Sequence, residues 1–316
     1  QADNDGAIDE VARLVLLEPV VGDVAVLLGN GCLAVELRDE LHAVAFSTDG
    51  TRLVSGAKDG DVLLWDAANP GMRSGNFIFP ERVDGANLLP DGRRLLTIKR
   101  DESPSLFDLR TRQRTNLSLP PTGITSFSAP DSIFHYDQDK WLTLYQLTGS
   151  ALKEIRRDEV GPRFQGGDYY AAKDLLAVGH RGTNRFEVMN VKAGTVRRTF
   201  LSPEPTPVTP IWFMDEGRHL FAVGDDAQAQ IWNVERGEPV PLPKPFMVIN
   251  VYRNLTFTRG PVFAVLSFAQ EELRFYLNFF DFRKTPLAPI SVPILGEPPG
   301  SLALSHDGKW LAYGTP

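Results

Sequence analysis

The sequence predicts an all-β fold, a seven-bladed β-propeller made of four-stranded antiparallel blades. Seven times along the 316 residues, an apolar stretch runs into a turn and restarts as a second apolar stretch. The turns are anchored at Asp49, Asp91, Asp131, Asp174, Glu216, Arg259 and Asp307. Successive anchors are 42, 40, 43, 42, 43 and 48 residues apart. A period of 40–45 residues made of short strands indicates one propeller blade per repeat.

The first repeat is the clearest of the seven. Its apolar stretches at 43–46, 52–56 and 62–66 alternate with a period of two, as strands with one inward and one outward face do. Asp49-Gly50 and Asp59-Gly60 separate these stretches. Both are typical of hairpin turns, because glycine tolerates a positive φ.

The same repeat resembles the WD-repeat family. The match consists of Ala-Phe-Ser-x-Asp-Gly at 45–50, Ser-Gly at 55–56, Asp59-Gly60 and Trp65-Asp66. The resemblance implies that a serine, an aspartate and the tryptophan are linked by hydrogen bonds through a histidine. Ser55, Asp59 and Trp65 match this pattern, and His42 lies near the expected histidine but does not follow a glycine.

The other repeats keep the strands and lose parts of the motif. Phe107-Asp108 replaces Trp-Asp in the second repeat, whereas the fifth repeat restores the tryptophan as Trp232. The sixth repeat is the most divergent, with strands expected at 262–266 and 273–277. The seventh ends with Trp310–Tyr313, so two strands are lacking at the C-terminus.

The N-terminal part of the chain supplies candidates for these two strands. Residues 22–31 are expected to form the third strand of the last blade and its turn, and residues 33–38 the fourth. Closure by strands from both ends removes exposed sheet edges. We therefore predict a propeller over residues 22–316, preceded at 1–21 by an acidic tail or linker with a short apolar segment. Because the chain begins at Gln1, we expect it to be part of a longer protein.

Composition narrows the class of partner. The formal net charge is −7, whereas generic nucleic-acid binding requires a basic footprint. No apolar run has the length of a membrane span. Cys32 is the single cysteine, which fits a reducing compartment such as the cytoplasm. These observations predict a protein or peptide partner, which could be a domain of the same polypeptide, and argue against nucleic acid and membrane.

Motifs for catalysis are lacking in the sequence. It contains no His-Glu-x-x-His, Gly-x-Ser-x-Gly or phosphate-binding glycine loop, and its five histidines lie in different repeats. We therefore expect no catalytic residue, no cofactor and no metal. The alternative is a propeller hydrolase or lactonase with a metal in the central channel, because ligands can converge from separate blades.

Loops are where a propeller carries its function. The turns between second and third strands and the connections between blades are expected to lie on the same face of the propeller. The candidate partner-binding residues in these loops are Arg82, Arg100, Asp101, Asp137, His180, Arg181, Asp225 and Asp226. The residues expected to have structural roles in the blade motif are Ser55, Asp59, Trp65, Asp66 and Trp232.

A locally basic stretch in the second repeat has two interpretations. Between Arg93 and Arg114 there are seven basic residues and three acidic ones. On an acidic protein such a patch could steer an acidic partner. The alternative is a solvated face with nothing bound.

Overall fold

The structure is a computed structural model, and it describes residues 24–28, 31–35, 41–47, 49–57, 61–67, 73–78, 83, 85–98, 103–119, 124–129, 131–136, 141–159, 164–180, 183–202, 208–224, 226–242, 247–248, 255–256, 260–294, 301–305 and 310–314. Within these ranges the regular structure is made of strands and two short 3-10 helices, η2 (Ala171–Lys173) and η3 (Asp215–Gly217). The predicted all-β class is therefore confirmed.

Five of the sheets contain four strands in chain order, each antiparallel to the next. The first contains β3 (Leu41–Phe46), β4 (Arg52–Ala57), β5 (Asp61–Asp66) and β6 (Arg73–Ile78). The second contains β7 (Gly85–Leu88), β8 (Arg94–Ile98), β9 (Ser105–Asp108) and β10 (Gln113–Asn116). The third contains β11 (Ile124–Ala129), β12 (Ser132–Tyr136), β13 (Trp141–Thr148) and β14 (Ala151–Glu159).

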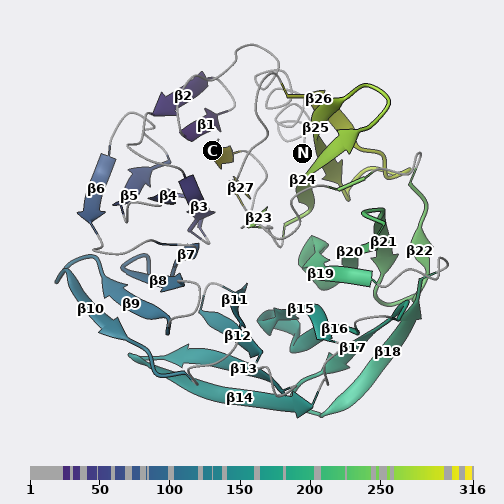
Figure 1. The fold of residues 1–316 in the computed structure, drawn as a ribbon, viewed down its shortest axis with the longest axis horizontal. Helices are drawn as coiled ribbons and strands as arrows, with labels where there is room; N and C mark the ends of the chain where they lie inside the picture. Colours follow the sequence, from purple (N-terminus) through teal and green to yellow (C-terminus); the bar gives the residue numbers. More distant parts are fainter. Residues whose placement is uncertain are drawn as a thin grey trace.

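The fourth contains β15 (Phe164–Tyr170), β16 (Leu175–His180), β17 (Arg185–Asn190) and β18 (Thr195–Leu201). The fifth contains β19 (Val208–Met214), β20 (His219–Gly224), β21 (Ala229–Asn233) and β22 (Pro239–Val240). In Figure 1 the sheets follow one another around a common centre, with the first strand of each sheet innermost and the fourth at the rim.

The sixth sheet departs from the predicted four strands. Within the described residues it contains β24 (Val262–Ala269), β25 (Arg274–Asp281) and β26 (Ile290–Pro293). The short strand β23 (Leu255–Thr256), which precedes them, pairs in parallel with β27 (Ser301–Leu304) of the next sheet. Its backbone hydrogen bonds are therefore made with the neighbouring sheet.

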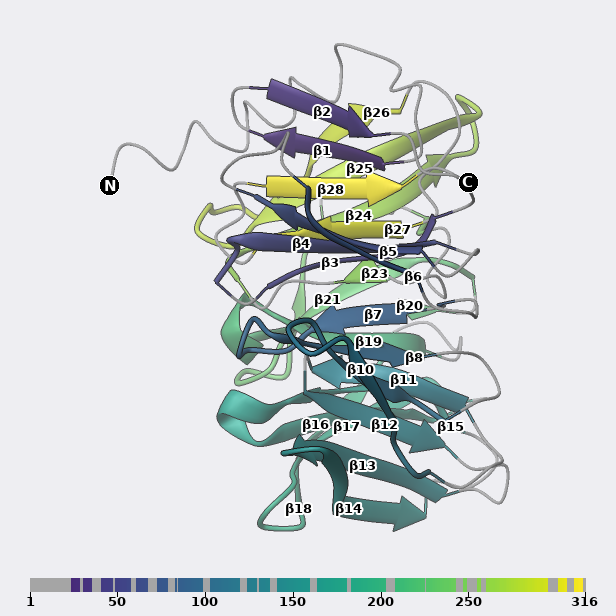
Figure 2. The ribbon, with the colours of Figure 1, turned by 90° about the vertical axis from the view of Figure 1, so that its left-hand side faces the viewer.

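The last sheet combines strands from both ends of the chain. Its order is β2 (Gly31–Val35), β1 (Val24–Leu28), β28 (Trp310–Gly314), β27 and then β23. Figure 2 shows β2, β1 and β28 side by side. The antiparallel register joins Leu28 to Trp310 and Val24 to Gly314.

The start of β2 differs from the prediction. The Gly-Asn-Gly sequence at 29–31 led us to place Gly31 in the turn and to start the strand at Leu33. In the structure β2 begins at Gly31, which pairs with Leu28, and Cys32 pairs with Leu27. The strand gains two residues because glycine and cysteine both accept extended backbone. The predicted tail at 1–21 lies outside the described residues.

Alternation along the strands assigns successive side chains to two different cores. On β16, Leu175 and Ala177 pack toward the fifth sheet, whereas Leu176 and Val178 pack toward the third. A strand that is buried on both faces is apolar at every position. This explains why the second strand of a repeat reads as an unbroken run such as Leu-Leu-Ala-Val-Gly at 175–179.

Each apolar cluster lies between two consecutive sheets. Between the fourth and fifth sheets, Phe186 stacks on Phe200 at 4.8 Å, and Trp232 meets both rings edge-on. Phe221 and Phe263 meet at 4.8 Å between the fifth and sixth. The tryptophan predicted to be structural, Trp232, therefore contributes to the joint between two sheets.

The motif in the first sheet is formed in part. Trp65 Nε1 donates to Ser55 Oγ at 3.0 Å, and both side chains are buried. Asp66 ends β5, whereas Asp59 lies outside the described residues. In the fifth sheet the serine is replaced, and Trp232 Nε1 donates to Gln230 Oε1 at 3.2 Å. The indole N–H groups of the two tryptophans thus donate to different acceptors.

We predict that Ser55→Ala lowers the free energy of unfolding by about 1–3 kcal/mol, because it removes the Ser55 acceptor from a buried indole N–H. Urea denaturation of the variant and of wild type measures the difference. Trp65→Phe removes the donor, so adding Ser55→Ala to Trp65→Phe should cost much less than Ser55→Ala alone. Equal costs in the two backgrounds would contradict this role for the hydrogen bond.

Candidate functional site

The structure describes two of the eight predicted partner-binding residues. His180 ends β16 and pairs with Phe164 of β15. Asp226 is exposed, and its Oδ1 accepts a hydrogen bond from the backbone N–H of Gln228 at 3.0 Å. The remaining six lie outside the described residues: Arg82, Arg100, Asp101, Asp137, Arg181 and Asp225. Their placement therefore stays a prediction.

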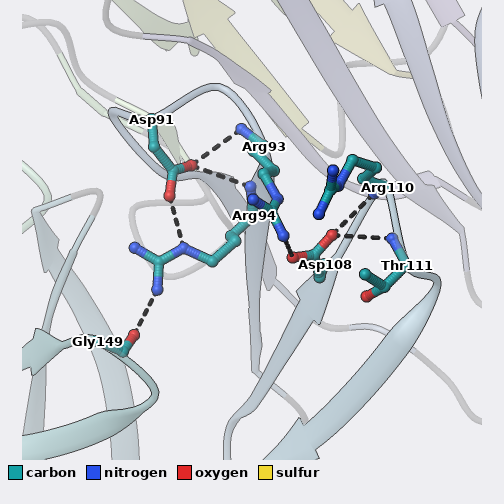
Figure 3. A network of polar contacts seen from close by, with 7 residues as sticks. All are labelled: Asp91, Arg93, Arg94, Asp108, Arg110, Thr111 and Gly149. Atoms are coloured by element: carbon teal, nitrogen blue, oxygen red, sulfur yellow. Dashed lines mark hydrogen bonds and ion pairs between the residues drawn. The ribbon is translucent and has the colours of Figure 1, made fainter.

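A network of polar residues lies at the opposite turns of the second sheet (Figure 3). Asp91 organises the turn between β7 and β8, because its Oδ1 accepts from the backbone N–H groups of Arg93 and Arg94 at 2.9 and 3.0 Å. Its Oδ2 accepts from Arg94 Nε at 2.5 Å. Burial raises the pKa of Asp91, but these hydrogen bonds outweigh it and lower the pKa overall.

Arg94 connects this turn to the next sheet. Its Nη1 donates to the carbonyl oxygen of Gly149, in the turn between β13 and β14 (Figure 3). A guanidinium can donate to a carboxylate and to a carbonyl at once because its five N–H groups point in fixed, different directions. Arg94 thus fastens the second sheet to the third.

Asp108 forms the second half of the same cluster. Arg93 Nη2 donates to Asp108 Oδ2 at 2.5 Å, and the backbone N–H groups of Arg110 and Thr111 donate to Oδ1 at 2.9 and 3.0 Å. The Arg93 guanidinium holds the pKa of Asp108 far below its ordinary value, and the two backbone donors act in the same direction.

These pairings change the interpretation of the basic stretch. Arg93 and Arg94 are both paired with aspartates, and Arg114 Nε donates to Ser105 Oγ at 2.9 Å. Charge that is already neutralised within the fold attracts an acidic partner weakly. This arrangement favours a structural role for Arg93 and Arg94 over the steering role considered from the sequence.

Arginines make similar links between other neighbouring sheets. Arg52 Nη1 donates to the carbonyl oxygen of Gly92 at 2.7 Å, joining the first sheet to the second. Arg156 Nη1 donates to that of Val191 at 3.0 Å, joining the third to the fourth. The sequence analysis missed these links, although Arg52 and Arg94 each follow their turn anchors by three residues.

The link between the fourth and fifth sheets passes close to a glycine. Arg198 donates to the carbonyl oxygens of Glu235 at 2.6 Å and Arg236 at 3.2 Å. Gly237, at φ 75°, follows them, and a Cβ there would lie 2.5 Å from Arg198 Nη1. Glycine is favoured by the backbone conformation, and any larger residue would require the end of the Arg198 side chain to shift.

Two of these arginines lie next to β-bulges, which affect the direction of their side chains. On β18, Arg198 pairs with Val188 and Val196 with Met189, so Arg197 is an extra residue. On β14, Ile155 is the extra residue in the same way, immediately before Arg156. A bulge bends the strand and increases its twist. Each of these two cross-sheet arginines directly follows a bulged residue.

The structure offers no sign of a metal centre in its described part: no three His, Cys, Asp or Glu side chains there are grouped so that they could hold an ion. Among the same residues, no helix has the length and apolar character needed to cross a membrane.

The sheets arranged around a common centre have the fold of a β-propeller, and the first of them carries part of a WD-repeat motif. Residues 32–66 match the family model described as WD domain, G-beta repeat, which confirms the resemblance found in the first repeat. A search of curated proteins gave no match.

Solved structures of β-propellers match most of the chain. The β-propeller domain of Cps50 (Swd1) from Myceliophteria thermophila is 14% identical, with a TM-score of 0.59, and the match covers 87% of this chain and 97% of that one. U3-55K is 13% identical with a TM-score of 0.62, covering 94% and 93% of the two chains. The WD40 repeats of RRP9 are 13% identical with a TM-score of 0.62, covering 94% and 91%. At such identities the likeness concerns the fold.

We predict that Arg94→Met lowers the free energy of unfolding by about 0.5–1.5 kcal/mol, because it removes the bonds to Asp91 and Gly149. Arg110→Met is the matched control, since the exposed Arg110 side chain lies beside the same cluster and Figure 3 draws no bond from it to Gly149 of the third sheet. Denaturant titration of both variants should give a change within about 0.5 kcal/mol for the control. Equal losses would contradict a role for Arg94 in joining the sheets.

The lowered pKa of Asp108 predicts a pH-dependent contribution to stability. Its folded-state pKa lies below the ordinary 3.8, so the contribution is complete above that value and is lost as pH falls toward the folded-state pKa. The melting temperature of wild type should exceed that of Asp108→Asn by a constant amount at neutral pH, and the difference should shrink below about pH 4. Arg93→Met, which removes the main cause, should show the same pH dependence. A difference that persists unchanged to about pH 2 would refute this assignment.

Proposed function

We propose that the protein is a non-catalytic interaction module that presents a rigid surface to a protein or peptide partner, within a larger signalling or regulatory protein. The observation that carries the proposal is the likeness to WD-repeat propeller structures over 87–94% of the chain. A propeller is rigid because each sheet is packed between two others, and rigid surfaces lose little entropy on binding.

We further propose that the seven sheets are the blades of one closed ring that spans residues 22–316. The pairing of β1 with β28 supports closure, because it ties the two ends of the chain within one sheet. The five-stranded arrangement of that sheet adds β23, which crosses from the preceding repeat.

The partner site is proposed to lie on the face that carries the turns between second and third strands. The candidate residues there are Arg82, Arg100, Asp101, Asp137, His180, Arg181, Asp225 and Asp226. Support comes from the opposite turns, where Asp91, Asp108 and their arginines bond to one another and to the next sheet. Charged groups engaged in this way contribute less to recognition than charged groups in loops, and loops on rigid scaffolds commonly carry binding residues.

Affinity purification of the tagged full-length protein from its source cells tests the proposal. Arg100→Ala combined with Asp101→Ala should abolish co-purification of a stoichiometric partner while leaving the melting temperature unchanged. Arg110→Ala, at the opposite turns, is the matched control and should retain the partner. Failure to detect a partner with wild type would contradict the proposal. So would a stoichiometric Ca²⁺ or Zn²⁺ whose removal abolishes a hydrolase activity.

A further inference from the structure

The turn between β24 and β25 leaves a large apolar side chain in solvent. Leu273 is 77% exposed, more than any other large apolar side chain in the described part of the chain. The sequence analysis placed it inside a strand at 273–277, whereas β25 begins at Arg274. The apolar pattern alone did not distinguish a strand residue from an apolar residue at the end of a turn.

The backbone of Leu273 is strained. Its φ is 51°, in the left-handed region that leucine avoids, and the turns before β14, β18 and β22 carry glycine at such a position, as Gly149, Gly194 and Gly237. An exposed apolar residue in this conformation gains no free energy from burial, and its backbone conformation is unfavourable. Glycine or asparagine would avoid both the exposure of an apolar side chain and the strain of a positive φ. A contact with a binding partner can offset both costs.

Hydrogen bonds connect this turn to the neighbouring turn between β20 and β21. Phe268, near the end of β24, donates its N–H to the carbonyl oxygen of Met247 at 3.1 Å. Val248 donates to the carbonyl oxygen of Ala227 at 2.9 Å, and Gln228 forms an isolated bridge with Met247. Residues 247–248 thus join the two turns into one continuous surface.

This surface is apolar at its centre. Phe268 and Phe275 are half-buried, with ring centroids 5.0 Å apart, and Met247 is also half-buried. We call the group of Ala227, Met247, Phe268, Leu273 and Phe275 the tip surface. Large partly exposed apolar groups that lie together mark interaction sites.

The surroundings of the tip surface are acidic. Among the described residues, Asp226, Glu271 and Glu272 are exposed there, against one exposed base, Arg274. Glu272 accepts a hydrogen bond from the hydroxyl of Tyr276. A basic partner segment would be attracted, and an acidic one repelled.

One polar atom between the two turns lacks a hydrogen bond. Gln228 Oε1 is buried and has no donor among the described residues. A buried acceptor without a donor raises the free energy of the unbound protein. An N–H donor brought by a partner, or admitted as the turns adjust around it, would remove this cost.

We propose that the tip surface binds a protein segment in which one large apolar side chain is flanked by lysine or arginine. The apolar side chain would cover Leu273 and the pair of phenylalanine rings, and the basic residues would face Asp226 and Glu271. The proposal rests on the proposed function as an interaction module and assigns it a second contact region. It concerns residues distinct from those exchanged in the purification experiment.

The strain at Leu273 provides a variant that separates folding from binding. Leu273→Asn places a residue that tolerates positive φ at the turn, so the melting temperature should stay equal or rise by about 2 °C. Leu201→Asn is the matched control, because Leu201 is 62% exposed but lies on β18, in another sheet. Both variants lose one exposed leucine, and only the first lies in the tip surface.

A random 12-residue peptide library displayed on phage is selected on wild type and depleted on the Leu273→Asn variant. Enriched peptides should combine one large apolar residue with two or more lysines or arginines. Fluorescence anisotropy of the enriched synthetic peptide should show affinity about tenfold lower for Leu273→Asn than for wild type and Leu201→Asn, and affinity should fall with added salt.

Three outcomes would overturn the proposal: no peptide enriched over the depletion step, enriched peptides that are acidic, or equal affinity for wild type and Leu273→Asn. Each of these outcomes leaves the interaction function open, because that function is tested separately by the effect of the Arg100 and Asp101 substitutions on co-purification. A melting temperature lowered by Leu273→Asn would show instead that the leucine stabilises the fold. That result would also overturn the proposal.

Discussion

The fold depends on one constraint, that every sheet must have both faces covered by its neighbours. Apolar side chains on alternate positions of one strand enter different cores, as Val262 and Ala264 of β24 do toward the seventh sheet and Phe263 and Val265 toward the fifth. A sheet of this kind cannot be stable alone, because removing a neighbour exposes one whole face. The repeat period follows from this constraint, since each unit has to provide four strands with the same two-sided pattern.

Where the apolar packing between two sheets ends, hydrogen bonds from arginine side chains join the sheets. At the turns, the arginines of one sheet donate to backbone carbonyls of the next, as Arg52 does to Gly92 and Arg156 to Val191. These carbonyls lie at turns, and a carbonyl oxygen has two lone pairs, so a guanidinium can bind them without breaking the turn. The charged groups on this face are therefore largely engaged in structure, which leaves the opposite face, including the tip surface, for recognition.

The sequence predicted what depends on local pattern and missed what depends on neighbouring sheets. The period, the second strands and the membership of Ser55 and Trp65 in one motif were readable, because each lies within one repeat; the direct bond between the two side chains replaces the predicted link through a histidine. The cross-sheet arginines were not, since which carbonyl Arg198 reaches depends on a bulge on its strand and on Gly237 in the next sheet. The parallel pairing of β23 with β27 was missed for the same reason. Most of the predicted partner site lies outside the described residues, so its eight residues stay a prediction from loop position.

Some described residues with a positive φ have side chains that form hydrogen bonds within the fold, whereas Leu273 does not. This difference bears on function. Asp174 and Asp215 occupy this conformation with side chains that bond to nearby groups, Asp174 to the N–H of Lys192 and Asp215 to His219 and Arg218. Burial raises the pKa of Asp215, but its two partners outweigh it and lower the pKa overall, so the carboxylate stays ionised at neutral pH. Such bonds compensate the backbone strain within the fold. Leu273 has an apolar side chain that forms no hydrogen bond, and it lies mostly in solvent. Strain that the fold itself does not compensate is better explained by a contact made outside it, which is why the tip surface is interpreted as a binding site.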